Sequence, residues 1–354
     1  MSQETHTPNS LTQTSPHQKV TLRDDSTLEI YKLVCPVDPS LRGPVTALLN
    51  TEWPDGDFHW AESMAGNYAD SLTVVMCPGM RQGRWVGTAT VAYAASEAEV
   101  GAVCDVMTHP DARGLGVARA ATQAVTSHFV DQGGRAVYLG TGRDGNAQRV
   151  YQRIGYEWFH GGVMRHLPPD GQDFDRTYFA PGQPTSIRPA EWGDLPGVSA
   201  LFAQPYDMLA GDYVRGLFSP GRTFHGRCVS VFPYIYYDVT ARGGACRVLT
   251  GETAHRVLGL ATMTPIDTAY RRHVGVVDVM THDHFVERGP DLLKAVVDSG
   301  RAAQLERGLA YVPVTDTAKA QWMRDIGARS ACMLPEQVKL EKESVDVEVF
   351  DLSL

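Results

Sequence analysis

Hydrophobic and polar residues along the chain follow two alternating patterns. Short apolar runs of strand length are separated by segments whose apolar positions recur every three or four residues, as on one face of a helix. This alternation, with short connections, predicts a mixed α/β or α+β class. The pattern predicts strands at 27–35, 72–77, 85–93, 102–108, 136–140 and 157–166. It predicts helices at 39–49, from the turn at 113–118 to about residue 130, and at 144–154. It resumes with strands at 186–189, 228–238, 247–250, 257–263, 274–281, 309–314 and 329–350, and helices at 190–203, 290–306 and 318–326.

Two polar segments interrupt this pattern. Residues 1–19 contain almost nothing to bury, which predicts a disordered tail, and residues 169–185 are dense in Pro, Gly and Asp, which is typical of a linker. A length of 354 residues favours two domains. We therefore expect a first domain at 20–168 and a second at 186–354.

The two predicted domains share short motifs in the same order. The sequence DVMTH occurs at Asp105–His109 and again at Asp278–His282, an offset of 278 − 105 = 173. The pairs Gly87/Gly259 and Ile154/Ile326 lie in matching contexts at an offset of 172. An internal repeat of nearly constant offset predicts two copies of one fold.

Composition narrows the class of protein further. The net charge of −9 argues against nucleic acid or an anionic membrane surface as the main partner. The six cysteines are far apart and form no CxxC pair, which favours reduced thiols and a cytoplasmic location. No apolar run approaches the roughly 20 residues of a membrane span.

The stretch from Val100 to Ala120 combines a predicted strand, a turn and the start of a helix. Pro110 and Asp111 end the strand, because proline cannot donate to a sheet ladder. The turn Arg113–Ala118 then places two glycines at the mouth of a helix, where bare N–H groups and the helix dipole favour an anion. The stretch therefore predicts a phosphate-binding turn.

The sequence R-x-x-G-x-A at Arg113–Ala118, after a strand that ends in T-H-P, resembles a signature of the GCN5-related N-acetyltransferase (GNAT) superfamily. The helix with A-x-x-x-Y at Ala147–Tyr151, closing on Gly155-Tyr156, resembles a second signature. The resemblance covers Thr21–Pro168 well and extends through the repeat over Ser186–Leu354. It implies an α+β (mixed α/β) fold: two tandem acyl-CoA N-acyltransferase folds, each with a mixed, splayed central sheet flanked by helices.

The resemblance also implies where acetyl-CoA, the co-substrate, binds. Amides of the turn would hold its pyrophosphate, and its extended arm would pair with the end of the preceding strand, where Met107 or Thr108 also offers an amide for the oxyanion. Asp144 stands at the family's asparagine position, so Asn146 either takes that role or caps its helix. The expected cofactor-binding residues are Val106, Met107, Thr108, Arg113, Gly114, Leu115, Gly116, Val117, Ala118, Asn146 and Tyr151.

Acyl transfer to an amine requires the amine to lose a proton and the departing thiolate to gain one. Tyr151 matches the family's tyrosine that protonates the thiolate. The family's strand carboxylate falls on Ala102, which cannot act as a base. Glu99 is one candidate for the base, and the acidic residues of 52–68 are others. That segment also carries Trp53 and Trp60, which could hold a cation.

Strand alternation would place Ala102, Cys104 and Val106 on one face and Asp105 on the other. This arrangement favours a structural role for Asp105, and we expect Cys104 to pack beside the cofactor rather than act as a nucleophile. The histidines of the two DVMTH motifs have no partners at metal-ligand spacing, so no metal site is predicted.

The second copy lacks the phosphate-binding turn. Val286 stands at the arginine position, Pro290 has no N–H to donate, and Asp291 places a carboxylate where a pyrophosphate would lie. The counterpart of Tyr151 is Trp322 or Met323, neither of which is an acid. We expect the second domain not to catalyse but to shape the substrate pocket of the first.

These features predict an N-acetyltransferase (EC 2.3.1.-) that moves acetyl from acetyl-CoA to a primary amine of a small molecule, by direct attack in a ternary complex. Specialised-metabolite biosynthesis and antibiotic modification are the expected settings, and a monomer or homodimer the expected state. Two alternatives remain: a non-catalytic acyl-CoA-binding protein, and an acyltransferase that uses a longer acyl group or an O-acceptor.

Overall fold

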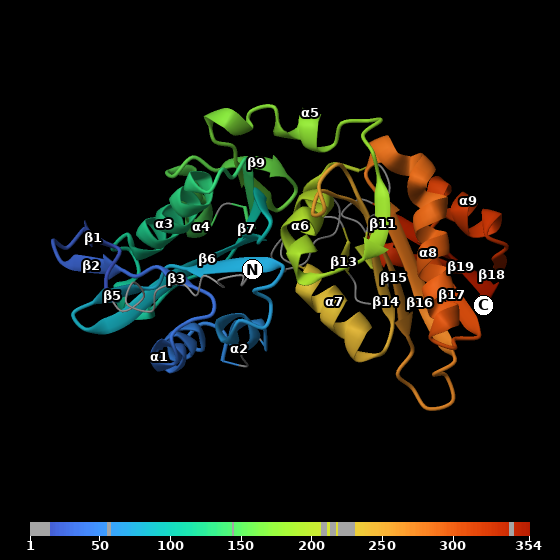
Figure 1. Cartoon of the computed structure of the whole chain (residues 1–354), viewed down its shortest axis with the longest axis horizontal. Coiled ribbons are helices and arrows are strands. Elements are labelled where there is room, and N and C mark those ends of the chain that lie inside the picture. Colours follow the sequence, from blue (N-terminus) through green and yellow to red (C-terminus); the bar gives the residue numbers. More distant parts are fainter. Residues whose placement is uncertain are drawn as a thin grey trace, which may run out of the picture. The chain divides into compact units, whose positions relative to one another are not determined.

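The computed structural model describes residues 15–54, 58–143, 145–206, 211–212, 217–218, 231–339 and 343–354 (Figure 1). The chain divides into two compact units. Unit 1 comprises Met1–Glu157 and Arg165–Gln172, and unit 2 comprises Trp158–Met164 and Asp173–Leu354. Most of the predicted tail lies outside the described residues. Its last two residues belong to a strand, however, because Gln18 pairs with Ile30.

Unit 1 contains a mixed sheet with the strand order β1-β2-β5-β6-β7-β8, and β4 pairs with β6 and with β3. All of these pairs are antiparallel except β7 with β8. Figure 1 shows α3 on one side of β6 and β7, and α1 with α2 on the other. The strands are β1 (Gln18–Thr21), β2 (Thr27–Ile30), β3 (Leu33–Val34), β4 (Leu72–Met76), β5 (Gly79–Arg81), β6 (Arg84–Ala94), β7 (Glu97–Thr108) and β8 (Ala136–Gly140). The helices are α1 (Pro39–Leu49), α2 (Phe58–Ala65), η2 (Pro110–Ala112), α3 (Val117–Asp131) and α4 (Asn146–Gln152).

Helix α3 shows how the sequence builds this unit. It begins after Gly116 and ends before Gly133, and both glycines have a positive φ, as expected at helix boundaries. Its buried stripe includes Val117, Val125 and Phe129, which pack on the sheet. A Cβ on Gly87 of β6 would lie 2.5 Å from Cγ1 of Val117, so this glycine permits the close approach of the helix.

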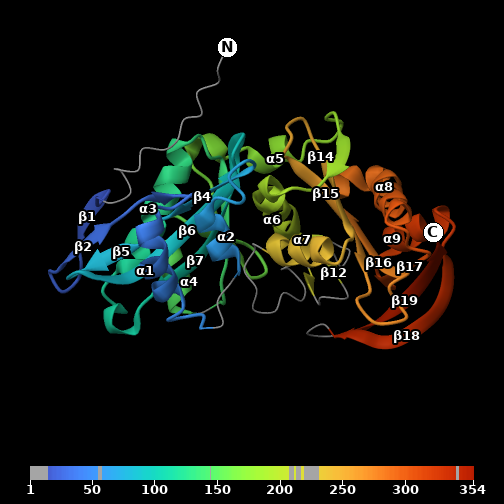
Figure 2. The ribbon, with the colours of Figure 1, turned by 60° about the horizontal axis from the view of Figure 1, so that its bottom comes forward.

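Unit 2 repeats the same succession of elements. Its sheet has the order β11-β14-β15-β16-β17-β19-β18, and only β16 with β17 is parallel. The order β16, α8, β17, α9 corresponds to β7, α3, β8, α4 of unit 1 (Figure 2). The strands are β11 (Ser186–Pro189), β14 (Ala245–Thr250), β15 (Val257–Pro265), β16 (Val274–Thr281), β17 (Arg307–Pro313), β18 (Arg329–Lys339) and β19 (Ser344–Ser353). The helices are η4 (Trp192–Asp194), α6 (Leu195–Ala203), α7 (Phe232–Ala241), η5 (Asp283–Arg288), α8 (Gly289–Ala302) and α9 (Thr317–Asp325).

The remaining elements are short. A two-stranded sheet joins β12 (Gly211–Asp212) to β13 (Leu217–Phe218). The segment after α4 contains β9 (Glu157–His160), β10 (Val163–His166), η3 (Pro169–Gly171) and α5 (Phe174–Tyr178). The last two of these lie within the predicted linker, and Phe174, Tyr178 and Phe179 are fully buried there. This segment is therefore a packed part of the fold, because its aromatic residues outweigh its Pro and Gly content.

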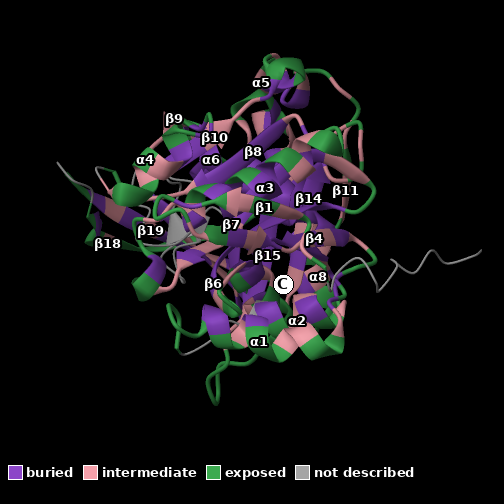
Figure 3. Cartoon of the chain, turned by 90° about the vertical axis from the view of Figure 1, so that its left-hand side faces the viewer, coloured by how far each residue is buried: buried purple, intermediate pink, exposed green. Residues whose placement is uncertain are grey.

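The strand expected at 228–238 is wrong. Residues 228–230 lie outside the described part, and Phe232–Ala241 forms helix α7. Its buried residues Phe232, Ile235 and Val239 recur every three to four positions, and Pro233 occupies the first helical turn. The run is so apolar and aromatic that this helical period is hard to separate from a strand. In both units the buried positions, which Figure 3 shows in purple, lie on strands and on helices.

Candidate active site

The two parallel strands of unit 1 pair along only part of their length. Strand β7 pairs with β8 at Val100, Gly101 and Ala102, and the register ends there. The rest of β7, from Val103 to Thr108, keeps β6 on one side. The sheet therefore opens between β7 and β8, which is the splay that the resemblance predicts. An extended molecule could pair with β7 in this opening, beyond the last residue that pairs with β8.

A β-bulge interrupts β7 within the splay. Thr88 pairs with Met107 and Thr90 with Cys104, so one residue of β6 faces two residues of β7, and Asp105 has a φ of 51°. The predicted alternation is therefore wrong, because the bulge resets it. The Cys104 thiol lies 3.2 Å from Oδ2 of Asp105, to which it donates, although simple alternation would separate the two side chains. Cys104, Asp105 and Val106 are all half-buried in the middle of this strand.

The predicted phosphate-binding turn lies at the end of β7, and we call Arg113–Ala118 the cradle. Gly114 and Gly116 have φ values of 81° and 105°, and a Cβ on either would meet no atom within 4 Å. Among the described residues, nothing accepts a hydrogen bond from the N–H groups of Gly114, Gly116, Val117 or Ala118. Free N–H groups at a helix start, below open space, fit a pyrophosphate. Leu115 differs from this expectation, because its N–H donates to Ala112 O at 3.4 Å.

Two residues outside the motif contact the cradle. Arg113 Nη2 donates to Glu52 Oε2 at 2.8 Å, and Arg113 Nε donates to Thr108 O at 3.2 Å. Arg23 Nη1 donates to Gly114 O at 3.0 Å. Glu52 belongs to the acidic segment that the sequence singles out. Arg23 lies 91 positions from Gly114, and no local pattern points to it.

Tyr151 and Asn146 lie on α4, the next helix. The Tyr151 side chain is buried, with its ring centroid 6.1 Å from that of Tyr156. Tyr156, which follows α4, in turn shares a hydrogen bond of 2.8 Å with Thr126 Oγ1 on α3. Asn146 does not cap the helix, because Gly145 is the N-cap. Its exposed side chain has no partner among the described residues, and Asp144 lies outside them.

Glu99 lies at the other end of β7. Its Oε1 accepts a hydrogen bond of 2.9 Å from Arg135 Nη1, just before β8 begins. Nine residues separate Glu99 from Thr108, which is about 25–30 Å along a strand. The geometry therefore does not bring Glu99 to the cradle.

The acidic and aromatic segment 52–68 is partly described. Trp53 is half-exposed and Trp60 is buried, with their ring centroids 5.6 Å apart. Glu62 is hydrogen-bonded to Asn67. Asp55 and Asp57 lie outside the described residues, as does the side chain of His59. Only Trp53 of this pair is open to solvent, and Glu52 connects the segment to the cradle.

In unit 2 the corresponding opening contains a buried ion pair. Strand β16 pairs with β17 only from Val274 to Val277. Beyond this point Lys319 Nζ, on α9, lies 2.8 Å from Asp278 Oδ1, on β16. The side chain of Lys319 is 3% exposed and that of Asp278 is 15% exposed. The β15–β16 register has no bulge, so Asp278 pairs directly with Thr262.

The helix start in unit 2 is covered. Gly289 has an ordinary helical φ of −53°, and a Cβ there would lie 2.3 Å from the Trp322 ring. Asp291 forms an ion pair of 3.1 Å with Arg288. The expectation of a lost phosphate site thus has a physical basis: an indole lies against the turn, and the nearby arginine is already paired.

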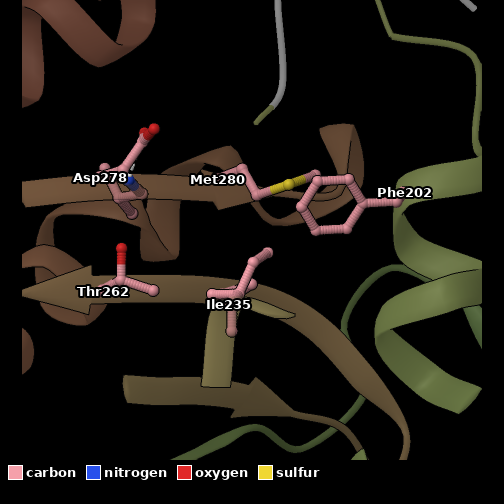
Figure 4. Close-up of a pocket in the computed structure, with 7 residues that line it drawn as sticks. Phe202, Ile235, Thr262, Asp278 and Met280 are labelled. Carbon is pink, nitrogen blue, oxygen red and sulfur yellow. Dashed lines mark hydrogen bonds between the residues drawn. The ribbon is translucent and has the colours of Figure 1, made fainter. Parts of the chain in front are cut away.

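Asp278 also lines a small cavity of about 20 Å³ in unit 2. Its other lining residues are Phe202, Ile235, Leu260, Thr262, Val279 and Met280. Figure 4 shows Met280 reaching the ring of Phe202, with Asp278 and Thr262 on neighbouring strands. A space of this size holds about one water molecule. It is too small for a substrate.

Two other classes of site can be tested in the described part of the chain. There, no three His, Cys, Asp or Glu side chains gather in a way that could hold a metal ion. None of the described helices is long and apolar enough to cross a membrane.

Comparison with solved structures finds acetyltransferases of low similarity. A ribosomal-protein-alanine N-acetyltransferase from Brucella melitensis is 16% identical, with 48% of this chain and 99% of that chain covered, at a TM-score of 0.39. A GNAT-family acetyltransferase from Streptococcus pneumoniae is 15% identical, with 48% and 99% covered, at 0.39. A phosphinothricin acetyltransferase from Sinorhizobium meliloti, solved with acetyl-CoA, is 13% identical, with 48% and 88% covered, at 0.40. At these values none of the three identifies a substrate for this chain.

Family models give the more specific result. No curated protein matches the chain in sequence. The model of the acetyltransferase (GNAT) family matches residues 45–156, which include the splay, the cradle and Tyr151. This part of unit 1 is therefore similar to the acetyltransferase (GNAT) family.

Proposed function

We propose that unit 1 is an N-acetyltransferase that moves an acetyl group from acetyl-CoA to a primary amine of a small molecule. The observation that carries this proposal is the opening beyond Ala102 between β7 and β8, which leads to a cradle with free N–H groups. Acetyl-CoA would lie with its pyrophosphate on Gly114–Ala118 and its arm along Val106–Thr108, within reach of Asn146. The net charge of −9 is compatible with a cationic acceptor.

Two side chains carry the proton transfers in this proposal. Tyr151 on α4 protonates the departing thiolate, as its match to the family tyrosine implies. We assign proton acceptance from the amine to Asp105, because it is half-buried on the bulge beside Cys104, in the part of β7 beyond its pairing with β8. Glu99 is the weaker candidate, since Arg135 already pairs with it at the closed end of the two strands. Direct attack in a ternary complex then needs no covalent enzyme intermediate.

Substitution separates these roles. Tyr151→Phe removes the acid, so we expect kcat to fall at least tenfold with an acetyl-CoA Kd within twofold of the wild type. Asp105→Asn keeps a residue type that tolerates the left-handed backbone, and should lower kcat by about a hundredfold. Glu99→Gln is the matched control and should leave kcat nearly unchanged. Equal losses in Glu99→Gln and Asp105→Asn would contradict the assignment of the base.

The acceptor is found by measuring CoA thiol release from acetyl-CoA with a panel of amines, amino sugars and alcohols. Turnover with an amine supports N-acetyl transfer. Calorimetry then decides between an enzyme and a binding protein: acetyl-CoA binding without turnover for any acceptor would favour the non-catalytic reading. Absence of binding would refute the proposal altogether.

We assign no acetyl-CoA site to unit 2. The Lys319–Asp278 pair fills its opening, and Trp322 covers its helix start. The expected stoichiometry is therefore one acetyl-CoA per chain, which native mass spectrometry measures directly. Two acetyl-CoA molecules per chain would contradict this assignment.

A further inference from the structure

We infer that Arg23 is a positioning residue for the cofactor's pyrophosphate, acting from the turn between β1 and β2, outside the GNAT signature. The inference rests on the proposed function of unit 1. Arg23 makes two separate contacts with the cradle. Its backbone N–H donates to Leu115 O at 3.2 Å, and its side-chain Nη1 donates to Gly114 O at 3.0 Å.

These two carbonyl groups are the ones that a longer helix would use as acceptors. In a helix extended by one turn towards its N-terminus, Gly114 O would accept from the N–H of Ala118, and Leu115 O from that of Arg119. Arg23 takes both carbonyl groups instead. The N–H groups of Ala118 and Arg119 then have no acceptor among the described residues. The positive φ values of Gly114 and Gly116 end the helix at this point, and Arg23 holds the two carbonyl groups that the break leaves without a helical partner.

The turn that carries Arg23 is itself anchored. Ser26 Oγ donates to Asp24 Oδ1 at 2.6 Å, and Arg81 Nε on β5 donates to Ser26 Oγ at 2.7 Å. Arg81 also forms an ion pair with Asp24. Because the sheet fixes this turn, Arg23 meets the cradle in a geometry that exists before any ligand binds. Such preorganisation lowers the cost of binding.

Charge supports the same role. Arg113, the arginine of the motif, is paired with Glu52 at 2.8 Å. Arg23 has no carboxylate partner among the described residues, so its positive charge at the cradle is not neutralised. The residue therefore acts in two ways, by orienting the N–H groups and by supplying positive potential beside them.

The experiment compares full-length Arg23→Gln, Arg23→Lys and the control Lys19→Gln. Lys19 lies on β1 of the same hairpin and pairs with Glu29, so its substitution removes the same charge away from the cradle. Calorimetry gives the Kd for acetyl-CoA, and kinetics give kcat and KM. We expect Arg23→Gln to raise Kd and KM about five- to tenfold at unchanged kcat and Tm. Arg23→Lys should recover at least half of the lost free energy, because one donor suffices for Gly114 O.

A second ligand separates positioning from direct contact with the cofactor's 3′-phosphate. The loss in Arg23→Gln should be the same for acetyl-CoA and for its 3′-dephospho form. A loss confined to acetyl-CoA would overturn the inference, as would an equal loss in Lys19→Gln or unchanged binding in Arg23→Gln. These failures differ from failure of the proposed function, in which the wild-type protein itself would not bind acetyl-CoA.

Discussion

The Glu52–Arg113 pair competes with the cofactor. A phosphate that takes over the Arg113 guanidinium would lie about 5–6 Å from the Glu52 carboxylate, where two unit charges repel by about 0.7 kcal/mol in water and about 3 kcal/mol at an effective dielectric constant of 20. The side chains of Arg113 and Glu52 are 58% and 40% exposed, so the repulsion lies near the lower of these two values. Glu52→Gln removes this repulsion and keeps the shape. We therefore expect acetyl-CoA to bind about three- to tenfold more tightly, a gain of about 0.7–1.4 kcal/mol.

Isothermal titration at 50 mM and 300 mM salt measures this effect. The gain should shrink at the higher salt, because exposed charges are screened over a Debye length of about 5–6 Å. Glu62→Gln is the matched control: it lies in the same acidic segment, is hydrogen-bonded to Asn67 and does not touch the cradle. Weaker binding in Glu52→Gln would refute the reasoning, since Glu52 would then be holding Arg113 in place for the cofactor.

Two further predictions concern unit 2. Burial, followed by the nearby charge of His284, lowers the pKa of His282 to about 4. An unfolded histidine binds its proton near pH 6.5. The contribution of His282 to the free energy of unfolding is therefore complete above about pH 6.5 and is lost as the pH falls towards 4. Urea unfolding should show about 2–3 kcal/mol less stability at pH 4 than at pH 7, and His282→Asn should remove that part of the difference. Lys319→Met should cost about 3–5 kcal/mol by leaving the Asp278 carboxylate buried, and a double-mutant cycle with Asp278→Asn should give a coupling of about 1–3 kcal/mol; additive effects would contradict a direct pair.

Much of this architecture could be predicted from the sequence, because the informative residues are local. Gly114 and Gly116 identified the cradle, since a turn with positive φ next to a helix is a property of neighbouring residues. The repeat of DVMTH located both parallel strands. The bulge at Asp105 was not predictable from alternation, because one extra residue on one strand depends on its register with β6. Arg23 could not be found at all, since its role depends on a contact across 91 positions.

The two units differ by the extra residue of the β-bulge in β7, as well as by the glycines at their helix starts. In unit 1 Gly87 pairs with Thr108 and, three residues along β6, Thr90 pairs with Cys104. In unit 2 the matching Gly259 pairs with Thr281, and three residues along β15 Thr262 pairs with Asp278. The aspartate of DVMTH therefore occupies two different places. In unit 1 it lies on the bulge beside Cys104, beyond the pairing of β7 with β8, and in unit 2 it lies on a regular strand and pairs with Lys319. In our proposal the motif supplies the base in unit 1, whereas in unit 2 it forms a buried ion pair, so the repeat alone could not assign a function to Asp105.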